Sequence, residues 1–412
     1  MTGGPTPKTA DVVVVGGGIL GLSIAWHLAR TGAGSIVVAD RLPLATQATS
    51  RAAALLTLGR KDDRVIPLIQ SSYRAIAMLG EVLDDPLPLH RNGTVYVATS
   101  ESSRRELQDL MLASTGKGVN FQTLESDDAG KLVPWLAVDG DAACAYCPDD
   151  AFIDPYLLAA AYADAARRSG AGIIPGLAVA SLILAGGKVA GVTTAAGEIA
   201  APVVVVAAGL WSNLLSASCG AGLPMAPVRS QYWITASDDR FPPGHPSVLL
   251  RDASAYTRPE LGALLFGLRE RRSISLDPRD LPVDVGGYAF AEDPDGLASL
   301  EESSAALHRF APTLADVGIR TYVAGFSTYT PDGLPVFGAA PGIDGLLFAG
   351  GCSGAGIAIS RGVGEAVAAL ALGQKPEIDI DAFRLDRFGT VDPFDPAFRA
   401  RCAAARSRKR EG

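Results

Sequence analysis

With 412 residues, of which 48% are hydrophobic, the chain is long enough to bury a large core, and its size favours two domains over one. Its net charge of −8 excludes a general electrostatic attraction to nucleic acid or to anionic lipid. The five cysteines are an odd number and only Cys144 and Cys147 lie close together, which argues against a disulfide framework and favours a reducing compartment. No second pair follows at metal-ligand spacing, so we expect no metal site.

The first element follows a short polar leader. Residues 12–29 carry no acidic or basic side chain and so imitate a membrane span, but four glycines interrupt them. The run starts with four valines, and the apolar residues after the glycines fall near helical spacing. We therefore expect a strand, a glycine turn and a helix. Residues 1–10 lack the apolar core of a signal peptide, so we expect a cytoplasmic protein with no membrane partner.

The glycine turn has the order G-x-G-x-x-G, with Gly16, Gly18 and Gly21. Bare backbone at a helix N-terminus lets N–H groups reach a nucleotide pyrophosphate. The next apolar run ends in Asp40, whose carboxylate can accept hydrogen bonds from both ribose hydroxyls and would repel the 2′-phosphate of NADP. Arg41 follows and could soften that repulsion. The motif predicts a dinucleotide site but does not separate NAD from FAD.

Further elements follow from the apolar periodicity. Helices are expected at residues 65–83, 101–115, 151–168, 297–310 and 359–372, and strands at 93–97, 171–180, 189–192, 198–201, 202–209 and 346–349. Residues 228–280 alternate apolar and polar side chains over several short runs, as antiparallel strands do. Strand, glycine turn and helix recur around residues 346–372. A basic run at residues 399–410 is expected to be a solvated tail.

Five motifs, at residues 16–21, 207–212, 256–260, 330–335 and 351–356, occur in an order and spacing that resemble the D-amino-acid oxidase superfamily of FAD enzymes. The resemblance is nearest to the sarcosine oxidase, dimethylglycine dehydrogenase and glycine oxidase branches and covers about residues 10–375. It implies an α/β protein, with a Rossmann-like FAD-binding domain and an α+β substrate domain built on an antiparallel sheet. We expect a discontinuous FAD domain (10–90, 151–225 and 321–375), a substrate domain (91–150 and 226–320) and a C-terminal extension (376–412).

The resemblance also implies which residues hold the cofactor. The first motif and Asp40 would bind the pyrophosphate and the adenosine ribose, Val179 would meet the adenine, and the last motif would lie along the flavin and its ribityl chain. The expected FAD-binding residues are Gly16, Gly18, Ile19, Leu20, Gly21, Asp40, Arg41, Thr49, Ser50, Ala52, Ala53, Val179, Ala208, Gly209, Trp211, Gly351, Ser353, Gly354, Ala355, Gly356 and Ile357. Gly325 stands where some sarcosine oxidases carry a flavin-linked cysteine, so we expect non-covalent FAD.

The implied reaction is oxidation of a C–N bond next to a carboxylate, with hydride transfer to the flavin and hydrolysis of the resulting imine. It demands no strong general base, and we assign no catalytic residue. Two family anchors for the substrate carboxylate are missing, because Ser327 replaces the arginine of glycine oxidases and Ala358 the lysine of sarcosine oxidases. Arg60, Arg258 and Arg269 are the candidate replacements.

Tyr256 matches a pocket tyrosine of the family. Small residues at Ser327, Ala355 and Ala358 predict a pocket larger than sarcosine needs, and hence an N-substituted glycine or another secondary amine as substrate. Leu265 stands where sarcosine oxidases carry a lysine that promotes reaction with oxygen. The electron acceptor is therefore oxygen or another molecule, and the alternatives are a dehydrogenase, a flavin subunit of a heteromeric amine dehydrogenase, or an NAD-dependent enzyme. The sequence leaves the oligomeric state open.

Overall fold

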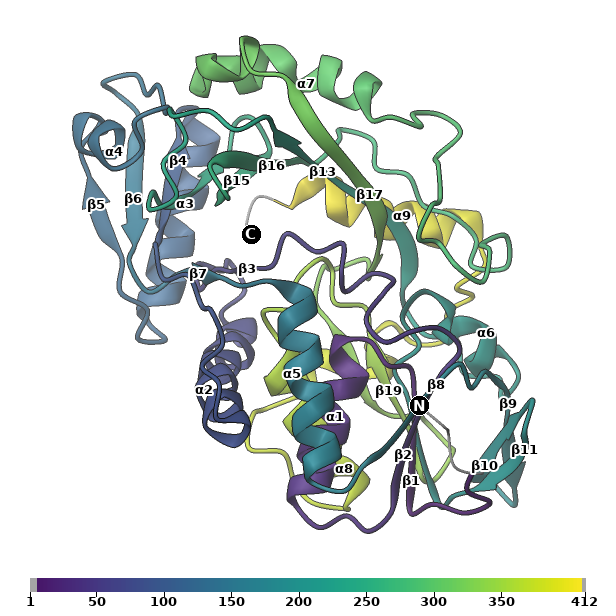
Figure 1. Cartoon of the computed structure of the whole chain (residues 1–412). Helices are drawn as coiled ribbons and strands as arrows, with labels where there is room; N and C mark the ends of the chain where they lie inside the picture. Colours follow the sequence, from purple (N-terminus) through teal and green to yellow (C-terminus); the bar gives the residue numbers. More distant parts are fainter. Residues whose placement is uncertain (1–5, 410–412) are drawn as a thin grey trace.

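The computed structural model describes residues 6–409 and contains two main sheets, one in each half of the molecule (Figure 1). The first sheet has six strands in the order β18-β19-β12-β1-β2-β8. Only β18 is antiparallel to its neighbour. The strands are β1 (Val12–Val15), β2 (Ile36–Asp40), β8 (Gly172–Pro175), β12 (Val203–Val206), β18 (Val336–Ala339) and β19 (Leu346–Gly350). Segments far apart in the sequence thus build one parallel sheet, as in doubly wound folds.

Both faces of this sheet are covered, which explains why its strands are valine-rich throughout. Val12 and Val14 pack into a core beneath the helices, whereas Val13 and Val15 pack against a three-stranded meander on the other face. The helices are α1 (Ile19–Arg30), α2 (Ile66–Leu83), α5 (Pro155–Arg168) and α8 (Ser360–Ala371), and the meander comprises β9 (Val179–Ala185), β10 (Lys188–Thr194) and β11 (Gly197–Ala200). Helix α6 (Ser212–Ala217) follows β12.

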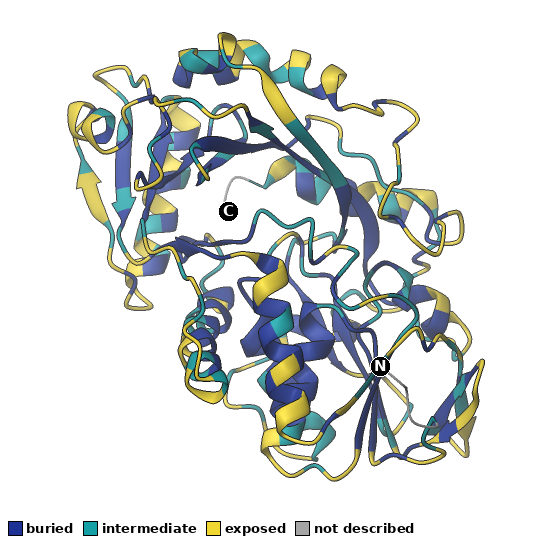
Figure 2. Ribbon diagram, in the orientation of Figure 1, coloured by how far each residue is buried: buried dark blue, intermediate teal, exposed yellow. Residues whose placement is uncertain are grey.

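The second sheet has eight strands in the order β17-β13-β16-β15-β14-β4-β6-β5. All neighbours are antiparallel except β4 and β14, which run parallel. The strands are β4 (Thr94–Ala98), β5 (Gln122–Leu124), β6 (Ala143–Cys147), β13 (Ala226–Thr235), β14 (Ser247–Leu250), β15 (Ala255–Glu260), β16 (Ala263–Leu268) and β17 (Ile319–Tyr329). Helices α3 (Glu101–Thr115), α4 (Ser126–Leu132) and α7 (Leu297–Phe310) belong to this half, and Leu307 and Phe310 of α7 pack in one core with Trp233 and Phe266. Figure 2 shows that most strands of both sheets are buried, whereas β5 and the outer turns of the helices are exposed.

Several boundaries differ from the sequence expectation. Strand β17 lies in the eight-stranded sheet, so the chain returns to the six-stranded sheet after Tyr329 rather than at residue 321. Helix α5 begins at Pro155 because the Asp154 carboxylate caps it, and the residues before it form β7 (Ala151–Phe152), paired with β3 (Leu55–Leu56). The strand expected at residues 171–180 is two strands, broken after Pro175, where Gly176 has a φ of +83°.

The expectation of a solvated C-terminal tail is wrong for the residues that the structure describes. They form α9 (Pro396–Arg408), which begins at an Asp395 cap with proline in the first turn. Its Phe398, Cys402 and Ala403 share a core with residues of β13 and β17. Arg410, the last residue of the basic run, lies outside the described residues. Within residues 6–409, no helix is long and apolar enough to span a membrane.

Candidate active site

A cavity runs from the carboxyl ends of the parallel strands to the eight-stranded sheet. It starts beside β1, β2 and β12 and ends among residues of β13, β15 and β17. Ligands of open α/β sheets bind at the carboxyl ends of the strands. One continuous cavity therefore joins a nucleotide end to a second end lined by the other sheet, and residues of the glycine-rich segment 350–356 at the end of β19 also line it.

The glycine turn after β1 forms one wall of the nucleotide end. Gly16 has a φ of +113°, and a Cβ there would lie 2.4 Å from the backbone oxygen of Ala207, so only glycine fits. Helix α1 begins next to it with no side-chain cap at Gly18. The Thr49 hydroxyl accepts the Ile19 N–H at 3.1 Å. Because Gly18, Ile19 and Leu20 line the cavity, the positive end of the helix faces it, as pyrophosphate binding requires.

The adenosine end combines one carboxylate with two buried donors. Asp40 lines the cavity and accepts the N–H groups of Gly17 at 2.6 Å and Leu42 at 2.8 Å. An ionised carboxylate has about four acceptor positions, so it can still receive ribose hydroxyls. The Arg41 guanidinium lies 3.8 Å from the centre of the Trp211 ring. Burial lowers the pKa of Arg41, against the charge of Asp40.

The donors of Arg41 and Trp211 test whether the residues at this end fit a dinucleotide. One Arg41 guanidinium nitrogen and the Trp211 indole N–H are buried and have no hydrogen-bond partner within the described chain, although both residues line the cavity. Buried donors normally find acceptors, and a dinucleotide carries phosphate and ribose oxygens in abundance. The residues at this end therefore fit a dinucleotide such as FAD.

Most residues expected to bind the cofactor reach the cavity. The ones that line it are Gly16, Gly18, Ile19, Leu20, Asp40, Arg41, Thr49, Ala52, Ala53, Val179, Ala208, Gly209, Trp211, Gly354, Ala355, Gly356 and Ile357. Four do not line it: Gly21, Ser50, Gly351 and Ser353. Gly21 instead lets the helix approach the turn, since its Cβ would lie 1.9 Å from the Gly16 oxygen, and Ser353 donates to the Gly351 oxygen at 3.2 Å.

The three candidate anchor arginines have different surroundings. Arg269 lines the cavity just after β16, 8% exposed, with its guanidinium 5.3 Å from the centre of the Tyr256 ring. Arg258 does not line it, because its guanidinium donates to the Ala53 oxygen at 2.8 Å and pairs with Glu260. Arg60 is also buried away from the cavity, with its backbone N–H bonded to Ser114.

The other substrate candidates, Tyr256, Ser327 and Ala355, line the same cavity as Arg269. Burial raises the pKa of Tyr256, although the charges of Arg269, Arg406 and Arg258 oppose this, so the phenol stays neutral. Of the predicted substrate residues, those that line the cavity are therefore one cation, one neutral aromatic hydroxyl and two small side chains.

Sequence reasoning missed several residues that line the cavity, among them Arg51, Tyr329, Arg406 and Lys409. Arg51 lies in a run of mostly small residues at 45–54, and a Cβ on Gly325 would lie 2.8 Å from the Arg51 Cδ. Arg406 and Lys409 come from α9 and its C-terminal end. The cap at residues 395–396 and the apolar positions 398, 402 and 403 were the sequence signal for this docked helix.

Known proteins resemble this chain over most of its length. Sarcosine dehydrogenase of Homo sapiens is 29% identical over 393 residues, covering 93% of this chain but 42% of that protein. Glycine oxidase of Bacillus licheniformis is 29% identical over 388 residues, covering 92% and 98%. The chain thus spans less than half the length of the sarcosine and dimethylglycine dehydrogenases that it matches.

Among solved structures, glycine oxidase from Geobacillus kaustophilus superposes with a TM-score of 0.78 at 25% identity, covering 92% of this chain and 99% of that one. The family model described as FAD dependent oxidoreductase matches residues 11–370, which include both glycine segments and the strands of both sheets. The chain belongs to this family of FAD-dependent oxidoreductases, and its cofactor is FAD.

Proposed function

We propose that the protein oxidises the C–N bond of an N-substituted glycine larger than sarcosine. The observation that carries the proposal is Arg269, a cation in the cavity at the end away from the adenosine site. The names of two relatives, a sarcosine dehydrogenase and a glycine oxidase, point to the same chemical class. Sarcosine and glycine each contain a carboxylate, which a buried arginine would bind.

In this mechanism the protein mainly orients the substrate. When bound, FAD accepts a hydride from the carbon next to the amine nitrogen. Arg269 would hold the carboxylate through charge-assisted hydrogen bonds, and the Tyr256 ring beneath the guanidinium restricts its rotation. The amine lone pair forms the C=N bond as the hydride leaves. Water then adds to the imine and the C–N bond breaks, which gives a carbonyl compound and a smaller amine.

The size of the substrate is inferred from the cavity wall. Ser327, Ala355 and Ala358 all line the cavity, and none has a side chain that reaches far into it. By the family resemblance, glycine oxidases carry an arginine at the position of Ser327, and sarcosine oxidases carry a lysine at the position of Ala358. Space that such a cation would fill is therefore available for an N-substituent.

Anaerobic mixing of the FAD-loaded protein with a homologous series tests the proposal. Glycine, sarcosine, N-ethylglycine, N-propylglycine and N-butylglycine are compared by the rate of flavin bleaching in the visible spectrum. We expect the longer N-alkylglycines to be reduced fastest at low concentration, and propylamine, which lacks the carboxylate, to be inert. Fastest reduction by glycine or sarcosine would overturn the size inference, and equal reduction by propylamine would overturn the anchor.

A second candidate is a dehydrogenase that passes its electrons to an acceptor other than oxygen. Leu265 is 1% exposed on β16 and does not line the cavity, so the position of the oxygen-promoting lysine of sarcosine oxidases offers no cation here. Admitting air after anaerobic reduction separates the two cases, because an oxidase recovers its flavin colour within seconds. Recovery only after adding an artificial acceptor such as ferricenium supports the dehydrogenase or the flavin subunit of a larger enzyme.

A further inference from the structure

Arg258 connects the two halves of the molecule beside the cavity. It belongs to β15 of the eight-stranded sheet and is 8% exposed. Its Nε donates at 2.8 Å to the backbone oxygen of Ala53, in the segment that leads from β2 of the six-stranded sheet to β3. The same guanidinium pairs with Glu260 and donates to the Pro259 oxygen at 3.0 Å. The bond to Ala53 therefore comes from a side chain that is itself fixed on its own strand.

Phe152 of β7 packs against the same guanidinium. The centre of its ring lies 4.9 Å from the guanidinium carbon of Arg258, close enough for cation–π attraction. Phe152 is paired with Leu55 in the two-stranded sheet of β3 and β7, and Ile153 donates its N–H to the Ala54 oxygen at 3.3 Å. The segment before β3 is thus held by Arg258 and by β7 together.

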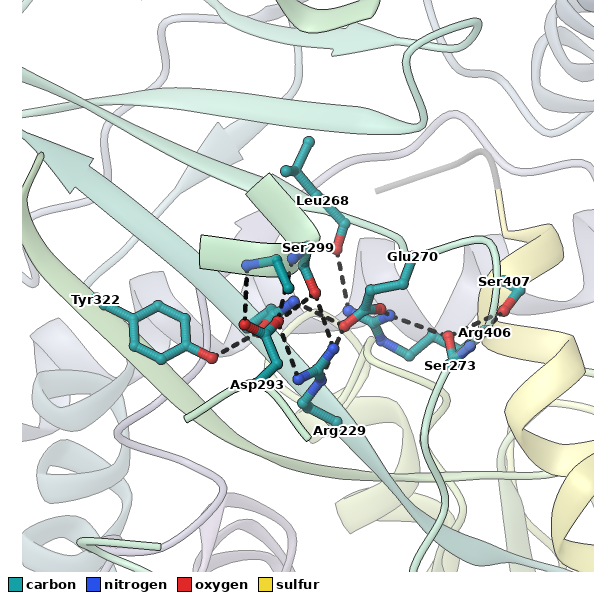
Figure 3. Close-up of polar contacts among 11 residues, drawn as sticks. Arg229, Leu268, Glu270, Ser273, Asp293, Ser299, Tyr322, Arg406 and Ser407 are labelled. Atoms are coloured by element: carbon teal, nitrogen blue, oxygen red, sulfur yellow. Dashed lines mark hydrogen bonds and ion pairs between the residues drawn. The ribbon is translucent and has the colours of Figure 1, made fainter. Parts of the chain in front are cut away.

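A second buried arginine network of the eight-stranded half joins it to α9 instead. Arg229 pairs with Glu270 at 3.1 Å and with Asp293 at 3.3 Å, and Glu270 also pairs with Arg406 of α9 (Figure 3). Arg406 in turn donates to the Leu268 backbone oxygen at 3.1 Å. This network fixes α9 against the end of β16, whereas the Arg258 side chain reaches across to the segment before β3.

The segment that Arg258 holds forms part of the cavity wall and has a strained backbone. Ala53, Ala54 and Leu55 line the cavity. Ala54 has a φ of +57°, in the left-handed region where a side chain crowds the backbone. Such a conformation persists only where the surrounding structure holds it, and strain of this kind clusters at binding sites. The contacts of Arg258 and β7 supply that support.

Of the backbone groups of Ala53 and Ala54, only the oxygens are bonded within residues 6–409. They accept from Arg258 and from Ile153, whereas the two N–H groups bind no acceptor in this part of the chain. Ala54 is 6% exposed, and buried N–H groups normally find an acceptor. This part of the wall therefore suits a ligand that carries hydrogen-bond acceptors.

We propose that Arg258 is a positioning residue for FAD: by binding the Ala53 oxygen, it holds residues 53–55 in a conformation that leaves their N–H groups for the bound cofactor. FAD carries acceptor oxygens and nitrogens along its whole length. Without the Arg258 bond, Ala54 relaxes to a negative φ in a fraction of the molecules, and FAD binds only to the remaining fraction. The inference concerns the cofactor and is independent of the substrate.

Serial dilution of the FAD-loaded full chain tests the inference, with the released FAD followed by its fluorescence. Arg258→Met keeps the length of the side chain but removes its donors. We expect the Kd for FAD to rise about tenfold or more in this variant, as the loss of a hydrogen bond to a charged group allows. The visible band of the FAD that stays bound should shift, because the surrounding donors have moved. A Kd equal to that of the wild type would overturn the inference.

Arg251→Met is the matched control for lost stability. Arg251 is 4% exposed, pairs with Glu106 at 2.8 Å in the same half of the molecule and lies outside the lining of the cavity. Removing one partner of a buried pair destabilises the fold, so both variants should unfold at lower urea concentration than the wild type. Arg251→Met should nevertheless leave the Kd for FAD within about twofold, because distant sites act independently. An equal rise in Kd in both variants would overturn the positioning role.

A second substitution separates positioning of the backbone from any other role of Arg258. Glycine adopts a positive φ without steric cost, so Ala54→Gly supplies part of what the Arg258 bond supplies. When Ala54→Gly is added to Arg258→Met, we expect the Kd for FAD to fall at least about threefold from its value in Arg258→Met alone. Absence of this recovery would overturn the inference. Where Arg258→Met is insoluble, Arg258→Lys takes its place in all three comparisons, because it keeps the charge but loses the planar fork that binds Ala53 and stacks on Phe152.

Discussion

Replacing Arg269 by glutamine removes the cation to which we assign the glycine carboxylate but keeps a hydrogen-bond donor of similar reach. Arg269 is 8% exposed, so its charge acts with little screening by water. Truncating one partner of a buried, hydrogen-bonded charge pair costs about 2–5 kcal/mol. The glutamine keeps one hydrogen-bond donor for the carboxylate, which places the expected loss near the lower end. We expect Kd for an N-alkylglycine to rise about 30- to 300-fold, at 1.4 kcal/mol for each factor of ten.

The assay is anaerobic stopped-flow reduction of the FAD-loaded protein over a range of N-propylglycine concentrations. It separates the apparent Kd from the limiting rate of hydride transfer, and we expect the limiting rate to fall less than binding weakens. FAD content is measured first for each variant, so that cofactor loss is not mistaken for weak substrate binding. Arg272→Gln is the control, since Arg272 is exposed three residues further along.

Three outcomes bear on the reasoning. A rise in Kd confined to Arg269→Gln supports the anchor. An unchanged Kd in Arg269→Gln would refute it and return the assignment to another cation of the cavity. An equal rise in Arg272→Gln would show that general charge, rather than a specific contact, attracts the substrate.

Three further predictions concern the cofactor and the fold. Gly16→Ala should give a protein that is purified without yellow colour, because the new Cβ would lie 2.4 Å from the Ala207 oxygen. Gly32→Ala is the control: Gly32 also has a positive φ, +72°, but no atom lies within 4 Å of its Cβ position, so this variant should keep its flavin. Acid precipitation of the wild type should release all flavin into the supernatant, since Gly325 offers no side chain for a covalent link; flavin retained in the pellet would contradict this. Burial, helped by the charges of Arg361 and Arg30, lowers the pKa of His27 from 6.5 to about 3. Between pH 3 and pH 6.5, His27 of the unfolded chain therefore binds a proton that His27 of the folded chain does not. Stability should therefore fall by about 2 kcal/mol between pH 7 and pH 5 from this residue, and urea unfolding of His27→Gln should show a correspondingly smaller pH dependence.

The sequence alone determined the elements whose signals are local. The valine run, the glycines at 16, 18 and 21 and the acid at 40 predicted the strand, turn and helix of the nucleotide end, because backbone clearance and periodicity are properties of neighbouring residues. Helix α7 was expected at residues 297–310, where the structure has it. The set of five motifs also indicated FAD, which the single glycine motif could not.

Tertiary structure decided which distant side chains share the cavity. Arg258 and Arg269 lie on adjacent segments of one hairpin, yet only Arg269 reaches the cavity, because the Arg258 guanidinium is held by Ala53 and Glu260. Nothing in the sequence indicated that the basic run of α9 lies beside the cavity. That placement depends on apolar contacts with β13 and β17 and on the buried pair of Arg406 with Glu270, which join residues more than a hundred positions apart. Periodicity shows which face of a helix is apolar, but the surface that covers this face is fixed only when the sheets have formed.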